Sequence, residues 1–117
     1  MRPLNAQRLV CWVVSDSAHW RSALRLMLVK LLPAPCSLTD VFAADLYGLL
    51  HHDQPDVVIW DRQATDWISA VQMLSRKVPA ALHVVIASSW TFEEKTMARA
   101  LGVHHCLERN DCAGTLR

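Results

Sequence analysis

The sequence has no long apolar segment and no large excess of charge of one sign. No apolar run reaches the roughly 20 residues that a membrane-spanning helix requires, so a membrane protein is not expected. The polar start and the short apolar stretch that ends at Ser15 and Asp16 do not resemble a signal peptide. The net charge is +1, which does not favour a strongly basic face for nucleic acid.

The sequence contains few glycines and no C-x-x-C motif. The three glycines, Gly48, Gly102 and Gly114, are scattered, so no glycine-rich phosphate loop is present. None of the four cysteines forms a C-x-x-C pair, and most lie in or beside apolar runs. We therefore interpret them as reduced thiols packed in a cytoplasmic protein, and not as a disulfide framework.

Apolar runs and amphipathic segments alternate along the whole chain. The runs typical of buried strands are 9–14, 36–41, 56–61, 82–87 and 103–107, and helical periodicity covers 16–32, 44–52, 66–77 and 91–102. This alternation predicts an α/β domain with a parallel sheet covered by helices on both sides. With 117 residues, the chain is long enough for one such domain and too short for two.

Several local signals support these elements. Thr91 and Glu94 form a capping-box pattern at the start of the last helix, and Gly102 ends it. Asp66 is a candidate N-cap for the helix before it. Among the five tryptophans, Trp12 and Trp60 lie in strands and are expected in the core, whereas Trp90 is either a partner contact or packed on its own loop.

Polar residues follow four of the apolar runs directly. Asp16, Asp61, Ser88 and Arg109 stand at or just beyond the ends of these runs. In open parallel sheets, ligands bind outside the carboxyl ends of the strands, so these side chains are expected to converge on one crevice. A carboxylate there can accept a phosphoryl group when a cation offsets its charge, and a hydroxyl and a basic side chain can hold the phosphoryl oxygens.

Four segments, 13–16, 55–61, 84–88 and 100–109, resemble motifs of the receiver domains of bacterial two-component response regulators. The family has an acidic pair, the phosphoacceptor strand, a strand ending in Thr or Ser, and a segment ending in lysine, in that order and at similar spacing. The resemblance covers residues from about 8 to 110. It implies a flavodoxin-like, doubly wound, five-stranded parallel sheet of order 2-1-3-4-5. Because the chain stops at Arg117, the fifth helix is expected to be truncated or absent.

The resemblance also assigns roles to individual residues. It implies that Asp61 is the phosphoacceptor, and that Mg²⁺ is held by Asp61, Asp16 and the backbone carbonyl of Gln63. Ser88 would contact a phosphoryl oxygen, and Arg109 would stand in the place of the family's lysine. The implied domain is a single receiver-like unit, 1–117, that forms the N-terminal part of a longer regulator.

Four positions depart from the family pattern. Ser15 replaces the first acid of the pair, which removes a negative ligand from the cation site. Arg109 is larger and more planar than lysine, so it is not an equivalent partner for an acyl phosphate. Arg62 is placed to pair with Asp61 without any phosphate, and Cys106 replaces the aromatic residue of the last strand.

These observations leave two main hypotheses. In the first, a histidine kinase or phosphotransfer protein phosphorylates Asp61, which controls dimerisation or an attached effector that regulates transcription. In the second, the chain is a degenerate pseudo-receiver that works as a phosphorylation-independent interaction or dimerisation module. A small-molecule-binding domain is a weaker third reading.

Neither main hypothesis makes the chain an enzyme beyond self-catalysed phosphotransfer and dephosphorylation, and nucleic acid would be bound only by an attached effector. A sheet face left uncovered by the missing helix predicts a homodimer.

Overall fold

The computed structural model describes residues 9–17, 20, 22–23, 36–63 and 66–108. Its centre is a parallel five-stranded sheet of order β2-β1-β3-β4-β5, which confirms the predicted fold class and strand order. The strands are β1 (Leu9–Val14), β2 (Cys36–Val41), β3 (Val57–Asp61), β4 (Leu82–Ala87) and β5 (His105–Glu108). The central strands β1 and β3 are paired in register, with Val14 opposite Trp60, so both strands end at the same edge of the sheet.

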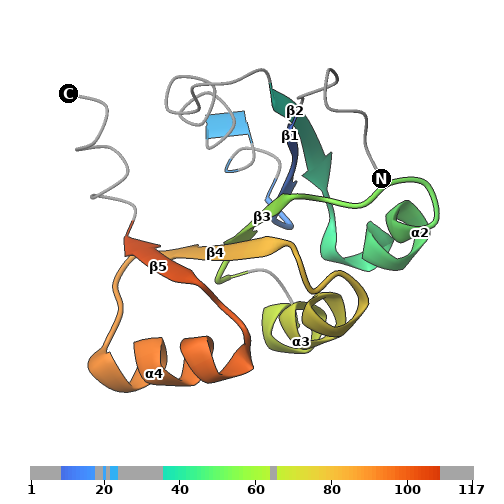
Figure 1. The fold of residues 1–117 in the computed structure, drawn as a ribbon. Coiled ribbons are helices and arrows are strands. Elements are labelled where there is room, and N and C mark those ends of the chain that lie inside the picture. The colour runs from blue at the N-terminus through green and yellow to red at the C-terminus, as the bar shows by residue number, and fades with distance from the viewer. Residues whose placement is uncertain (1–8, 18–19, 21, 24–35, 64–65, 109–117) are drawn as a thin grey trace.

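Three described helices cover one face of the sheet (Figure 1). They are α2 (Leu46–Leu50), which follows a short 3₁₀ turn at Ala43–Asp45, α3 (Trp67–Lys77) and α4 (Phe92–Leu101). Of the helix expected over 16–32, only the helical residues Trp20, Ser22 and Ala23 and the preceding residues 16–17 are described. The predicted truncation of a fifth helix falls on 109–117, outside the described residues. Within the described ranges, none of the helices is long and apolar enough to cross a bilayer.

The ends of α4 are built as the sequence predicts. Thr91 Oγ1 accepts a hydrogen bond from the amide of Glu94 (3.1 Å), and Glu94 Oε1 accepts from the amide of Thr91 (2.9 Å). Gly102 ends the helix with a φ of 113°, a conformation that side chains disfavour. At the same point a Cβ would lie 2.5 Å from Ser75 Oγ of α3, so glycine also allows α4 to approach α3 closely.

Two predicted boundaries and one predicted capping bond differ from the structure. The last strand begins at His105 and not at residue 103, because the amide of Val103 closes the end of α4 by donating to the carbonyl of Ala98 (3.0 Å). The segment 44–52 contains only five α-helical residues, since its start is a 3₁₀ turn. Asp66 occupies the N-cap position of α3, but it has a φ of 58° and its side chain makes no capping bond among the described residues.

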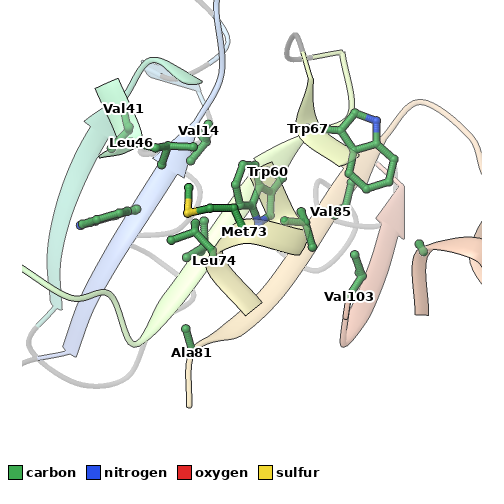
Figure 2. Close-up of a cluster of buried hydrophobic side chains, with 14 of the residues drawn as sticks. Val14, Val41, Leu46, Trp60, Trp67, Met73, Leu74, Ala81, Val85 and Val103 are labelled. Atoms are coloured by element: carbon green, nitrogen blue, oxygen red, sulfur yellow. The ribbon is translucent and has the colours of Figure 1, made fainter. Parts of the chain in front are cut away.

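The core is divided between the two faces of the sheet. Alternate strand residues such as Trp12, Val14, Trp60 and Val85 face the helices, where they pack against Leu74 and other side chains of α2 and α3 (Figure 2). The intervening residues on the other face form a smaller cluster that includes Cys11, Val13, Ile59 and Ile86, with Trp20 packed against it. The predictions that Trp12 and Trp60 are core residues are confirmed, because their side chains are almost completely buried.

Candidate functional site

Asp61 lies at the carboxyl end of the central strand β3, where its side chain is only 3% exposed. Its Oδ2 atom accepts a hydrogen bond from the hydroxyl of Ser15 (2.9 Å), and its Oδ1 atom accepts from the backbone amide of Gln63 (3.0 Å). Ser15 directly follows β1, so the parallel pairing of β1 and β3 places the two residues side by side. Ser15 and Asp61 therefore meet at this edge, whereas the wider convergence expected of Asp16, Asp61, Ser88 and Arg109 stays a prediction.

The backbone around Ser15 fixes the direction of its hydroxyl. The amide of Ser15 donates to the carbonyl of Val41 at the end of β2 (3.1 Å). The amide of Ser17 donates to Ser15 Oγ (3.1 Å), so the hydroxyl hydrogen is available for the carboxylate of Asp61. The seryl side chain is itself completely buried, and a buried hydroxyl of this kind stabilises the fold only while it keeps its acceptor.

Arg62 connects the end of β3 with α4 and does not serve as the predicted counter-ion of Asp61. Its guanidinium forms an ion pair with Glu94 (Nη1 to Oε2, 2.7 Å) and lies 5.0 Å from the ring centroid of Trp90. Its backbone amide donates to the carbonyl of Ile86 on β4 (3.0 Å). Hydrogen bonds from Thr91, together with the nearby charge of Arg62, hold the pKa of Glu94 below its ordinary value, which keeps this pair ionised.

Trp90 joins the same cluster to β5. Its indole N–H donates to the carbonyl of Leu107 (2.9 Å), and its backbone amide donates to Glu108 Oε1 (3.3 Å). Trp90 is 9% exposed, so of the two alternatives left open by the sequence the structure favours packing over a partner contact. Cys106, which stands where the family has an aromatic residue, is a free thiol packed against the helix-covered core, and burial raises its pKa.

Receiver domains are among the solved structures that share this arrangement of strands and helices. A LuxR-family response regulator from Aurantimonas sp. superposes with a TM-score of 0.78 at 16% identity, over 94% of this chain and 81% of that one. The signal receiver domain of a DNA-binding response regulator from Colwellia psychrerythraea gives 0.73 at 20% identity, over 87% and 86%. The chain has the receiver fold. A putative pilus assembly protein (CpaE) from Burkholderia thailandensis is also similar, with a TM-score of 0.75 at 19% identity over 87% and 86%.

The likeness lies in the three-dimensional structure. The sequence matches no family model and no curated protein. The resemblance stated from the four sequence segments is thus confirmed for the receiver fold, while the residue roles that it implied stay predictions.

The predicted Mg²⁺ ligands do not form a set that fits this cation well. Asp16 is exposed and lines a pocket between α2 and α3, and the backbone amide of Gln63 donates to Asp61, while the role of the Gln63 carbonyl stays a prediction. Both oxygens of Asp61 already accept protein hydrogen bonds, and a hydroxyl stands where receivers have an acid. In the described part of the chain, no three acidic, histidine or cysteine side chains gather into a cation site. Because Mg²⁺ prefers carboxylate oxygens in near-octahedral geometry, we derive no step that depends on it.

Of the two remaining predicted site residues, the structure describes Ser88. Ser88 lies beyond the end of β4 and is exposed, while the last residue of that strand is the buried Ala87. A hydroxyl that contacts Asp61 is instead contributed by Ser15. Arg109 lies outside the described residues.

A buried histidine lies on the sheet beside a second one, a pairing that was not predicted from the sequence. His83 on β4 is almost completely buried, and its Nδ1 accepts from the indole N–H of Trp60 (3.1 Å). The amide of His83 donates to His104 Nδ1 (3.0 Å), and the two imidazole rings stack with centroids 6.1 Å apart. Burial, and secondarily His104, lowers the pKa of His83 from 6.5 to about 4. The one signal for this in the sequence is a histidine within an apolar strand run.

The low pKa of His83 makes the fold less stable in acid. The folded protein keeps His83 neutral down to about pH 4, whereas the unfolded chain takes up a proton below 6.5. The contribution of His83 is therefore complete above pH 6.5 and decreases as the pH falls towards 4. At 1.36 kcal/mol per pKa unit, the loss amounts to about 3 kcal/mol. Urea unfolding of the protein at several pH values across this window measures it.

His83→Gln is the matched variant, because the glutamine carbonyl can still accept from Trp60 but does not titrate. We expect the difference in unfolding free energy between the protein and this variant to narrow as the pH falls. His52→Gln, at an exposed position, serves as the control for a histidine that burial does not affect. If the unfolding free energies of wild type and His83→Gln differed by the same amount at every pH between 6.5 and 4, His83 would not be the cause of the acid sensitivity.

Proposed function

We propose that this chain is a receiver-type signalling domain that acts through protein contacts, with Asp61 as a structural carboxylate and not as a phosphoacceptor. This corresponds to the second hypothesis from the sequence. The observation that carries it is the hydrogen bond from Ser15 to Asp61 within the buried end of the sheet. The family's receivers have an acid where this chain has Ser15, so the same position here stabilises Asp61 without a cation.

The chemistry of phosphoryl transfer supports this interpretation. A carboxylate that attacks a phosphorus atom needs an accessible oxygen and a positive charge to offset the incoming phosphate. Asp61 is 3% exposed, and each of its oxygens accepts a hydrogen bond from the protein. Replacing the first acid by serine also removes one negative charge from the ligands that would hold a cation.

The partners of such a domain are proteins. We propose a second copy of the chain and an attached effector as the candidate partners in a cytoplasmic signalling system, whereas a histidine kinase or phosphotransfer protein would be a partner only if Asp61 is phosphorylated. Nucleic acid would be contacted only by an attached effector. The receiver fold supports the proposal, and so does the cluster of Arg62, Trp90 and Glu94, which holds α4 and β5 in one arrangement without phosphate.

Phosphorylation of Asp61 is the second candidate function. It is favoured by the position of Asp61 at the carboxyl end of the central strand, beside the residues that end β1. Under this alternative, phosphorylation would require the Ser15 hydrogen bond to open so that Oδ2 becomes accessible.

Incubation with acetyl phosphate and Mg²⁺, followed by intact-mass measurement, separates the two candidates. We expect no phosphoryl adduct on this protein under conditions that modify an ordinary receiver treated in parallel. We also expect self-association measured by light scattering to be the same for wild type and Asp61→Asn. An adduct on wild type that disappears in Asp61→Asn would overturn the proposal in favour of the phosphotransfer switch.

A further inference from the structure

A pocket of about 500 Å³ opens between α2 and α3, next to the carboxyl end of β1. Its described lining consists of Asp16, Ala44, Leu46, Tyr47, Asp66, Ser69, Ala70 and Met73. The volume lies within the range that small-molecule sites occupy in proteins. Asp61 is not among the described residues of the lining, whereas Asp16, which follows Ser15, is.

The pocket combines an apolar base with an acidic rim. Leu46 and Met73 are buried residues of the main core, and Ala70 packs against them, so together they provide an apolar wall. Among the described lining residues, Asp66 places an exposed carboxylate at the rim, and Asp16 also lies there. A pocket of this kind attracts a cation and repels phosphate or another anion.

Asp66 has the features of a ligand-binding carboxylate. It stands at the N-cap of α3, where an aspartate ordinarily accepts from the backbone of the first turn, yet among the described residues its side chain makes no such bond. Its carboxylate is exposed at the pocket and is not committed to the helix. The phenol of Tyr47, which is 62% exposed, adds an aromatic face that can lie against a cation or an aromatic ring.

We propose that this pocket binds a small organic cation, namely an amine or guanidinium carried on an aromatic or aliphatic body. The cationic group pairs with Asp66, and the apolar body lies against Met73, Ala70 and the ring of Tyr47. This inference goes beyond the proposed function, because it does not depend on any chemistry at Asp61. A cation bound in this pocket would act on the domain without any phosphoryl group.

Titration of the full chain with tyramine and with agmatine, in EDTA to remove divalent cations, tests the proposal by heteronuclear NMR. We expect saturable shifts of α2 and α3 amides with each amine. Neutral para-ethylphenol has the aromatic body of tyramine without its charge, and we expect it to bind at least about fivefold more weakly.

Two variants locate the site. Asparagine tolerates the left-handed backbone conformation of position 66, so we expect Asp66→Asn to fold normally. Because this variant lacks the charge, we expect it to bind tyramine about fivefold more weakly. Ala70→Leu fills the pocket, and we expect it to abolish binding. Asp53→Asn changes an exposed carboxylate outside the lining and should leave the affinity unchanged. The proposal is wrong if neither amine shows saturable binding, if para-ethylphenol binds as tightly as tyramine, or if Asp66→Asn and Asp53→Asn have equal effects.

Discussion

Trp60→Ala is expected to lower the free energy of unfolding by about 3–5 kcal/mol, a large part of the roughly 5–15 kcal/mol of a typical small domain. Trp60 is in the central strand β3 and is completely buried against the helices. The truncation removes its contacts with the core around Met73 and Leu74 (Figure 2) and leaves a cavity. It also leaves Nδ1 of the buried His83 without its indole donor. Urea denaturation followed by far-ultraviolet circular dichroism measures the loss.

Trp60→Phe separates the contribution of core packing from that of the hydrogen bond to His83. Phenylalanine keeps an aromatic ring in the core but has no N–H group, so we expect a smaller loss of about 1–3 kcal/mol. Tyr47→Ala, at a largely exposed aromatic position, should change stability by less than about 0.5 kcal/mol. A Trp60→Ala protein within about 1 kcal/mol of wild type would contradict the central place of this residue in the core.

Ser15→Asp is expected to destabilise the protein by about 2–4 kcal/mol at neutral pH in EDTA, because it replaces a buried donor with a second carboxylate beside Asp61. The same change restores the acidic pair that the family has after its first strand. We therefore expect Mg²⁺ to recover most of the lost stability, since a cation that binds only the folded state shifts the unfolding equilibrium. Thermal unfolding with and without Mg²⁺ measures both effects.

Ser15→Ala is the control for this prediction. It removes the hydroxyl and adds no charge, so we expect a loss of about 1–3 kcal/mol and no response to Mg²⁺. Wild type should also show no stabilisation by Mg²⁺. Equal Mg²⁺ responses of wild type and Ser15→Asp would mean that the serine does not limit cation binding at this edge of the sheet.

Most of the fold follows from patterns that are local in the sequence. Continuous apolar runs predict the strands β1, β3 and β4, because a parallel strand covered on both faces needs apolar residues at every position. The capping box and Gly102 predict both ends of α4. The start of β5 was predicted two residues too early, since an apolar Val103 gives the same signal whether its amide closes a helix or joins a sheet.

The site was predictable in its location and much less in its contacts. The rule on strand ends brings Ser15 and Asp61 to one edge, and the structure places them there. Whether the hydroxyl of Ser15 or the carboxylate of Asp16 turns inwards depends on the turn after β1, where the amide of Ser17 orients the hydroxyl. Likewise, the choice of Glu94 as the partner of Arg62 depends on how α4 lies over the sheet, which no local pattern specifies.

The cluster around Trp90 has a consequence for how the domain transmits changes. Arg62 is bonded covalently to Asp61, its guanidinium lies over Trp90, and Trp90 is hydrogen-bonded to the backbone of β5. Two side chains, Arg62 and Trp90, thus connect the end of β3 beside Asp61 with the edge strand β5. A partner that draws the half-buried Glu94 away from Arg62 would remove the ion pair that holds the guanidinium beside Trp90, so a contact on the surface of α4 could reach the end of β3.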